Sequence, residues 1–415
     1  MIEATTRKPS LMKIVHLIAY FHPYLKYQEN HLVEEQVKEG HEVHVITSNI
    51  NFNFADYDKT MLPVIGTRRK KTGSFKLNGY CLYYLPTYFD VSGRVLLKGY
   101  LRLVNSLNPN IIIAHGITQL HTLGIVYSNI QAKIIVDEHV LYSDIASSNI
   151  RKLFYYLWGK FFSKRIQRRT SKIVAISYGV HKLLTTLMKI KEEKIQLISL
   201  GADSNTFYPD KEVGDTFRKH YKIPLDAIVI GYTGKIGEYK KVHLLLHIVN
   251  EIGFEKLHIL VVGNIMSSYK VFFERSVTSS KVPVTLLQAL PPQKLNAVYN
   301  ACDIVAWPAN QTISTVDASS CGKPIICSDF LVERFSSGQG IGIKAGNADS
   351  LKKALFCLIN DKDLRNKIHK KPFGYVLQKY TLIPQQLKST LIKVVCYTAF
   401  SSLEETEGCA LYYIK

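Results

Sequence analysis

Cysteine is scarce in this sequence, and its pattern excludes the folds that depend on it. The 415 residues include 7 cysteines, an odd number, and no Cys-x-x-Cys pair. Disulfide-framed secreted domains carry paired cysteines, and structural zinc sites carry closely spaced sets. We therefore expect neither kind of site, and a reducing cytoplasm is the simplest compartment for the chain.

Long apolar runs are also missing. A helix that spans a bilayer needs roughly 20 apolar residues in succession, and no stretch of this sequence reaches that length. The short run IVHLIAYF (14–21) is typical of a first strand and not of a secretory signal. If the protein works at a membrane, we expect it to lie on the inner face of the cytoplasmic membrane.

Acidic residues are outnumbered by basic ones. The chain has 53 Lys and Arg against 33 Asp and Glu, which gives a formal net charge of +20. Such an excess favours anionic partners, which include nucleic acids, lipid headgroups and phosphorylated small molecules. We do not expect nucleic acid binding, because the positive charge is dispersed and no zinc-finger spacing, RNP-like motif or basic tail is present.

Apolar runs rich in β-branched residues alternate with helical patterns along the chain. This order is typical of βαβ units and predicts parallel sheets covered on both faces, an α/β fold class. A chain of 415 residues is too long for one ordinary core, so we expect two domains. The predicted strands lie at 13–20, 42–47, 111–116, 133–139, 172–177 and 194–201, and then at 227–234, 257–264, 284–290, 303–308 and 323–329.

The domain division is predicted from a polar stretch at 203–226, which carries Pro209 and Pro224 and reads as an inter-domain linker. We predict an N-terminal Rossmann-like domain over residues 1–205 and a C-terminal Rossmann-like domain over 206–378. Residues 379–415 are predicted to form a C-terminal helix followed by a tail.

The first chemical motif is a loop with glycine and lysine directly after the strand at 227–234. Its sequence is GKIGEYKK, from Gly234 to Lys241. A loop of this kind can bring backbone N–H groups against phosphate. Lys235 and Lys240 could hold a diphosphate from two sides as it gains negative charge in a bond-breaking step. The alternative interpretation is a lysine-rich surface turn.

The second motif is DASSCGKPII, which begins at Asp317. We expect Asp317 to open a helix, where a carboxylate suits the positive end of the helix dipole, and Gly322 and Pro324 to end it. At the carboxyl ends of the strands, such a carboxylate can accept hydrogen bonds from ribose hydroxyls. A plain capping aspartate is the alternative.

Five motifs in one order, from about residue 12 to 375, resemble the retaining family-4 glycosyltransferases of the GT-B fold. They include the first strand–loop–helix–strand unit with GHEV at 40–43, the junction LISLGADSNTFYP at 197–209, and the two motifs above. The resemblance implies two Rossmann-like domains that face each other across a cleft, with the C-terminal helix returning to the N-terminal domain. It also implies hexosyltransferase-type transfer from a nucleotide sugar with retention of configuration.

The resemblance carries site roles over to matching positions of this sequence. Lys235, Lys240 and His139 would be the catalytic residues, the lysines on the donor diphosphate and the histidine on the transferred sugar. A hydrogen-bonded packing residue is the alternative for His139. The expected donor-binding residues are Asp317, Ser314, Thr315, Gly263 and Gly234, and the expected acceptor-side residues are Tyr27, Gln28, Glu29 and His115.

No metal or cofactor is expected, because the two lysines would supply the positive charge that a cation supplies elsewhere; the nucleotide sugar is a substrate. The sequence also departs from the family. Ala309 stands where the family has the first acid of a glutamate pair, and Asp317 shortens the second. A nucleotide-sugar epimerase or hydrolase on the same scaffold, and a non-catalytic homologue that acts as a partner protein, therefore stay open as alternatives.

A basic, aromatic stretch at 151–172 is predicted to be a helix. Aromatic residues beside a heavily basic face suit the surface of an anionic membrane. The alternative is an ordinary amphipathic helix packed on the sheet. With the membrane interpretation we expect a lipid-linked acceptor, as in polysaccharide or lipopolysaccharide assembly; otherwise the acceptor is a glycan.

Overall fold

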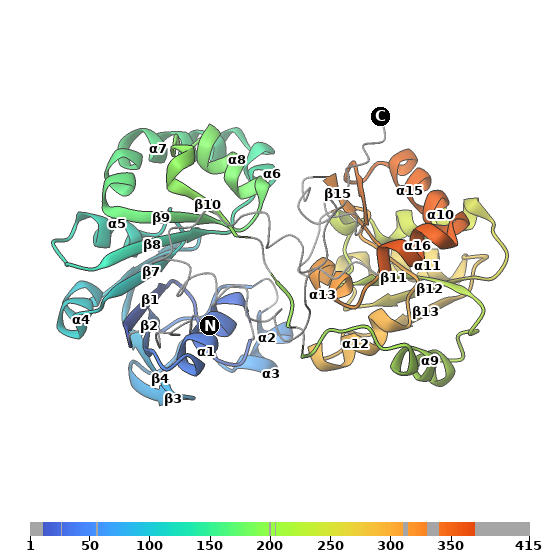
Figure 1. The fold of residues 1–415 in the computed structure, drawn as a ribbon, viewed down its shortest axis with the longest axis horizontal. Coiled ribbons are helices and arrows are strands. Elements are labelled where there is room, and N and C mark those ends of the chain that lie inside the picture. The colour runs from blue at the N-terminus through green and yellow to red at the C-terminus, as the bar shows by residue number, and fades with distance from the viewer. Residues whose placement is uncertain are drawn as a thin grey trace, which may run out of the picture.

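The fold was described from a computed structural model of the chain, in which two α/β lobes lie side by side (Figure 1). The first lobe runs from blue to green in the figure, and the second from yellow-green to red. The described residues are 11–25, 27–54, 57–198, 201–203, 205–309, 314–329 and 340–369. The predicted C-terminal helix at 379–415 lies outside these ranges.

The first domain is built on an eight-stranded sheet with the order β10-β9-β8-β7-β1-β2-β4-β3. Every neighbouring pair is parallel except β3 with β4. The strands are β1 (Lys13–Ile18), β2 (Glu42–Ser48), β3 (Gly73–Leu77), β4 (Tyr80–Leu85), β7 (Ile111–His115), β8 (Lys133–Glu138), β9 (Thr170–Ala175) and β10 (Ile195–Leu197).

Both faces of this sheet are covered, as the strand pattern predicts. On β1, Val15 and Leu17 belong to one buried cluster, which also contains Trp158 of α7 (Asn149–Arg169). Ile18, on the opposite face, packs in a second cluster with Val33 of α1 (Gln28–Lys38). This alternation with a period of two is expected for a strand between two helical layers.

The other helices of the first domain are short. They are α2 (Tyr57–Thr60), α3 (Leu62–Ile65), α4 (Tyr100–Leu107), α5 (Leu120–Tyr127), α6 (Tyr142–Ala146), α8 (Tyr178–Thr186) and the 3-10 turn η1 (Glu192–Lys194). A separate antiparallel hairpin of β5 (Thr87–Val91) and β6 (Arg94–Leu97) precedes α4.

The sequence prediction missed all four strands between residues 73 and 97. The physical reason is visible in β3, where four of five residues are exposed. A strand at the edge of a sheet needs no continuous apolar run, so the pattern that identified the buried central strands was absent there.

The second domain holds a six-stranded parallel sheet with the order β13-β12-β11-β14-β15-β16. Its strands are β11 (Ile228–Thr233), β12 (Leu257–Val262), β13 (Val284–Leu287), β14 (Ile304–Ala306), β15 (Ile325–Ser328) and β16 (Gly340–Ile343). The helical elements are α9 (Lys211–His220), η2 (Glu238–Lys240), α10 (Val242–Ile252), η3 (Ser267–Tyr269), α11 (Lys270–Thr278), α12 (Pro292–Asn300), α13 (Ser314–Ser320), α15 (Ala348–Asn360) and α16 (Lys362–His369).

The polar stretch at 203–226 is not an extended linker, because its centre is helix α9. Gly214 lies so close to the end of α12 that an added Cβ would stand 2.4 Å from the Asn300 carbonyl oxygen. Buried Arg218 donates to Asp303 at 2.8 Å, and the same carboxylate oxygen accepts the Val229 N–H at 2.8 Å. These contacts make the stretch part of the second domain, and they give Asp303 a structural role.

The chain passes between the domains just before α9. Ile198 still packs in a cluster of the first domain, whereas Ala202 and Phe207 belong to the core of the second. None of the helices in the described part of the chain combines the length and apolar character needed to cross a membrane.

Candidate active site

The order of strands in the second sheet marks its ligand-binding edge. The chain enters at β11, adds β12 and β13 on one side, and then returns to place β14 on the other side of β11. Ligands of open α/β sheets bind at the carboxyl ends of the strands where the order reverses in this way. The loop with Lys235 and Lys240 follows β11, and α13 with Asp317 follows β14. Both predicted motifs therefore follow the two strands at the switch point.

Side chains of the domain core hold the backbone of the lysine loop in place. The Tyr232 hydroxyl donates to the Lys235 carbonyl at 2.9 Å, and the Trp307 indole N–H donates to the Thr233 carbonyl at 2.9 Å. Ile236 is fully buried. The main chain of the loop is thus fixed by the core, while the Lys235 side chain is exposed.

Lys240 lies in a different environment from Lys235. Only 8% of Lys240 is exposed, and its ammonium nitrogen lies 5.4 Å from the centre of the Tyr239 ring. Burial lowers the pKa of Lys240, and the Asp144 carboxylate of α6 acts in the opposite direction. Asp144 and α6 belong to the first domain. Lys240 therefore lies on the side of the second domain that faces the first.

Tyr299 of α12 connects the two motifs, and the sequence analysis missed it. Its hydroxyl lies 3.0 Å from the Thr233 hydroxyl, directly before the lysine loop. Burial raises the pKa of Tyr299, and the charge of Asp317 adds to this rise. Side-chain hydrogen bonds with Thr233 and Ser314 lower the pKa. One buried phenol thus touches the end of β11 and the first turn of α13. A tyrosine within a helical apolar pattern carries no signal of such a role.

Two of the expected donor residues have structural settings that the sequence did not indicate. The described helix α13 begins at Ser314, so Asp317 lies within its first turn and not at its first position. A Cβ on Gly263 would stand 1.8 Å from the Gly234 carbonyl oxygen. The close approach of two backbones therefore requires glycine at 263, whether or not a ligand lies beside it. Thr315 is fully buried.

The first domain has its own switch point, between β1 and β7, because β2 and its neighbours lie on one side of β1 and β7 to β10 on the other. A buried polar network occupies this position. The His16 Nδ1 of β1 lies 3.0 Å from the His115 Nε2 of β7, and the His16 Nε2 lies 2.7 Å from the Gln36 side-chain oxygen. On its other side, the His115 Nδ1 lies 2.7 Å from Asp137 Oδ2 of β8.

The same oxygen of Asp137 also lies 3.3 Å from the Nε2 of His139. Burial alone would raise the pKa of Asp137, but the imidazoles of His115 and His139 hold it far below its usual range. Although burial acts against the charged form of His139, Asp137 raises the pKa of that imidazole to about 9. His139 is therefore a cation at neutral pH, with a third of its side chain exposed.

His16 has the opposite character. Burial and the neighbouring His115 lower the pKa of His16 to about 3. The network therefore begins at a neutral imidazole in the interior and ends at a charged one near the surface.

Glu138, which the sequence analysis also missed, positions the loops on either side of His139. Its two carboxylate oxygens accept the backbone N–H groups of Ile117, His139 and Val140, each at 2.9 Å. Burial raises the pKa of Glu138, and these bonds act against that rise. Three fixed N–H donors on one carboxylate hold the segments after β7 and β8 in register.

The predicted acceptor-side residues divide between the surface and the interior. Tyr27, just before α1, is 49% exposed, and Gln28 and Glu29 form the first turn of that helix. His115 is only 6% exposed, and in the network Asp137 lies between it and His139.

Glu29, His115 and His139 also form a group that could hold a metal ion, since one ligand atom of each lies within 4.8 Å of the others. An ion there would compete with Asp137 for both imidazoles, because that carboxylate already lies close to each of them.

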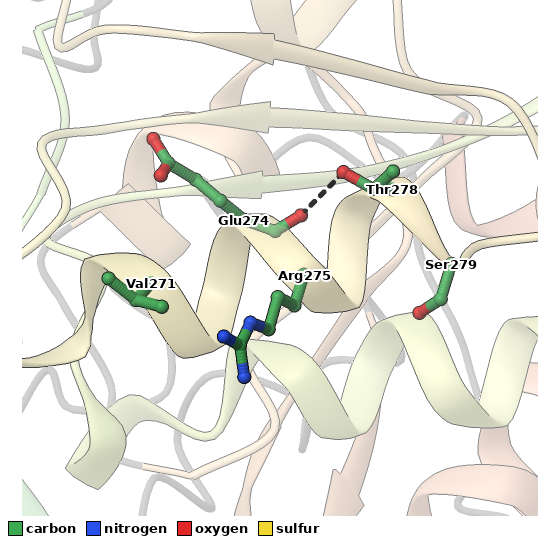
Figure 2. A pocket seen from close by; sticks show the side chains of 5 residues that line it. All are labelled: Val271, Glu274, Arg275, Thr278 and Ser279. Atoms are coloured by element: carbon green, nitrogen blue, oxygen red, sulfur yellow. Dashed lines mark hydrogen bonds between the residues drawn. The ribbon is translucent and has the colours of Figure 1, made fainter.

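An open hollow of the surface lies elsewhere, along α11 (Figure 2). Its lining side chains are Val271, Glu274, Arg275, Thr278 and Ser279, and the Thr278 hydroxyl donates to the Glu274 carbonyl at 2.9 Å. All five belong to α11 or the residue after it, and none of them is a candidate site residue.

Comparison with known proteins identifies the class of protein to which this arrangement belongs. Residues 30–206 match the family Glycosyltransferase Family 4, and residues 214–372 match Glycosyl transferases group 1. The chain belongs to the group 1/family 4 glycosyltransferases, and its two parallel-sheet domains have the GT-B fold.

Individual relatives are distant. A D-inositol 3-phosphate glycosyltransferase of Corynebacterium urealyticum is 26% identical over 191 residues, which are 41% of this chain and 44% of that protein. The chain thus aligns with less than half the length of this relative. The capsular polysaccharide biosynthesis glycosyltransferase CapM of Staphylococcus aureus is 23% identical over 250 residues, 57% of this chain and 63% of that protein.

Among solved structures, HepE of Anabaena in complex with UDP and glucose superposes with a TM-score of 0.62. The superposition covers 92% of this chain and 99% of that one at 17% sequence identity. At such low identity the likeness extends to the fold alone.

Proposed function

We propose that this protein is a cytoplasmic enzyme that transfers a sugar from a nucleotide-sugar donor to a glycan or lipid-linked acceptor, in the synthesis of a cell-surface polysaccharide or glycolipid. The observation that carries the proposal is the position of two motifs, the lysine loop and α13, after neighbouring strands at the switch point of the second sheet. The relative CapM, by its name, acts in capsular polysaccharide synthesis, and the structural neighbour HepE holds UDP and glucose.

The donor would bind to the second domain. Lys235 and Lys240 would contact the diphosphate, and the charge that develops on it during transfer would be stabilised by ammonium groups already in place. The burial of Lys240 strengthens that interaction, because less water screens it. Asp317, in the first turn of α13, would accept hydrogen bonds from the ribose hydroxyls.

The sugar would lie toward the first domain, where His139 is the charged end of the buried network. An imidazolium donates hydrogen bonds and accepts none, so His139 would donate to a sugar hydroxyl. Asp137 acts through His139 as a positioning residue. In this proposal transfer proceeds with retention of configuration, and domain closure excludes water from the reacting centre.

We propose that transfer needs no metal ion, since the lysines supply the charge. The group of Glu29, His115 and His139 gives this part of the proposal its own test. Transfer by protein treated with EDTA should equal that of untreated protein, and added Zn²⁺ or Mn²⁺ should not raise it. Activity that EDTA abolishes and one of these cations restores would contradict the metal-independent mechanism.

The donor site is tested by a thermal-shift panel of nucleoside diphosphates and their sugars. Specific stabilisation by one base would name the donor, since a ligand that binds only the folded state raises the melting temperature. Lys240→Ala should lose that shift. Lys281→Ala removes an exposed lysine that belongs to neither motif, and this variant should keep the shift. No shift with any nucleotide would contradict the proposal.

One observation leaves two alternative functions open. Ala309, at the position of the family's first glutamate, is only 5% exposed and offers no carboxylate. An epimerase or hydrolase would convert the nucleotide sugar with no acceptor present. A non-catalytic partner protein would bind the nucleotide without turnover. Product analysis with donor alone, and then with donor and acceptor, separates these outcomes from transfer.

A further inference from the structure

Helix α7 packs its inner face firmly against the first domain. Tyr155, Trp158 and Ile166 are buried in the main core of that domain. At Gly159 the fit is so close that an added Cβ would stand 2.6 Å from the Cα of Met188. The apolar residues of this side of the helix are thus covered by the domain itself.

The outer face of α7 is also apolar over its first three turns. The exposed fractions are 83% for Ile150, 56% for Leu153, 38% for Leu157 and 65% for Phe161. Their spacing of three, four and four residues places them in one row along the helix. We call these four residues the apolar row. Because apolar residues lie on both faces of α7, the sequence pattern did not show which of them are buried and which form the exposed row.

The basic residues from 160 to 172 divide into two groups. Three are engaged by the domain itself: Arg165 donates to the Val126 carbonyl at 2.8 Å, Arg169 to the Ile130 carbonyl at 2.9 Å, and Lys172 to the Glu193 carbonyl at 2.9 Å. Lys160, Lys164 and Arg168 are exposed on the outer side instead. The helix contains no acidic residue. The predicted basic face at 151–172 is therefore smaller than the sequence suggested, and it flanks an apolar row.

We propose that the outer face of α7 docks on an anionic lipid bilayer, with the apolar row inserted at the interface and the flanking cations on the headgroups. An apolar stripe on a helix whose charged residues are all basic is the composition of helices that lie in the plane of such a surface. A second copy of this chain is a poorer occupant, because the charges of α7 are all positive and two such helices repel each other.

The position of α7 connects this surface to the proposed function, on which the next step rests. Arg151 donates to the carbonyl of Asp144 at 3.4 Å, and Asp144 is the residue of α6 that interacts with Lys240 across the domains. Figure 1 shows α7 at the outer edge of the first lobe, with α6 toward the second. The apolar row thus begins beside the candidate site, where a bilayer would present the head of a lipid-linked acceptor.

The test uses the full-length protein and sedimentation with vesicles of phosphatidylglycerol or of phosphatidylcholine. We expect binding to the anionic vesicles that weakens with salt, and about tenfold weaker binding for the variant Ile150→Ser/Leu157→Ser/Phe161→Ser. The matched control Val271→Ser/Phe272→Ser removes two similarly exposed apolar residues from α11 and should bind as wild type. Lys160→Gln/Lys164→Gln should weaken binding to anionic vesicles and reduce its salt dependence.

Two results would overturn the inference. One is vesicle binding that depends neither on lipid charge nor on the apolar row, seen as equal binding to both lipids with no loss in the triple variant. The other is a wild-type dimer in light scattering that the triple variant converts to monomer, which would make the row a contact between copies. The nucleotide thermal shift needs no vesicles and should be unchanged in the triple variant. A failure of membrane docking is therefore distinguishable from a failure of the donor site.

Discussion

The two domains build their halves of the candidate site in different ways. In the first domain, side chains hold other side chains: His16, His115, Asp137 and His139 form one network that runs from the interior toward the surface. In the second domain, the core holds the backbone of a loop, through Tyr232 and Trp307, and the charged side chains extend from it.

We infer different roles for the two halves of the candidate site from this difference. A buried network fixes the protonation state and direction of one group, because a buried charge is stable only with its partner. A pinned loop fixes where its backbone N–H groups stand and from where its lysine side chains extend. We expect substitutions in the first domain to change pH dependence and stability, and those in the second to change donor binding and rate.

The largest effect on rate is expected from the second domain. Lys240→Ala should lower the rate of transfer by about 10²–10³, the usual loss for one preorganised charge that stabilises the transition state. Steady-state kinetics would measure it, with Lys281→Ala as the control. Lys240→Arg should recover part of the rate, because it restores the charge. Undiminished transfer by Lys240→Ala would remove the lysine from the mechanism.

The network of the first domain is best tested by Asp137→Asn. Without this carboxylate the pKa of His139 should fall from about 9 toward its ordinary value near 6.5. The alkaline limb of the pH–rate profile should then move to lower pH by the same amount. Rate profiles measured between pH 5 and 10 would show the shift, and an unchanged limb would separate His139 from the reaction.

The same variant has a predicted effect on stability. The raised pKa of His139 contributes stability that is fully present below about pH 6.5 and is lost as pH rises through about 9. The lowered pKa of Asp137 contributes stability above about pH 4 that is lost on acidification. Breaking the buried pair should cost about 3–5 kcal/mol in the free energy of unfolding at pH 6, and less at pH 9.5. Urea denaturation at both values measures the difference; equal losses would contradict the assignment.

The smallest effect is expected where the two motifs of the second domain are joined. Tyr299→Phe removes the hydroxyl that lies 3.0 Å from the Thr233 hydroxyl and should cost about 1 kcal/mol of stability. Donor affinity should fall a few-fold, because the lysine loop and α13 lose a shared contact. Titration of the donor nucleotide would detect this, with Tyr127→Phe, an exposed tyrosine of the first domain, as the control. An unaltered affinity would show that the two motifs hold their places independently.

The central strands of both sheets were predictable because they are buried on both faces. β12, for example, is buried at all six of its residues, and five of them are apolar. The lysine loop was predictable from glycine and charge placed directly after such a strand, and α13 from an aspartate followed by glycine and proline. The strands β3 and β5 and the helix α9 were not, because exposed strands and a polar helix show no such run of apolar residues.

Sequence by itself determined the alternation of elements, from local pattern, and the two-domain division, from chain length. It also singled out 235, 240 and 317 from their motifs, and 139 from the family resemblance. Tertiary structure alone decided which of those groups meet. The charge of His139 depends on Asp137 and on burial, and the link between the two donor motifs depends on Tyr299. These are contacts between segments far apart in the chain, and no local pattern encodes them.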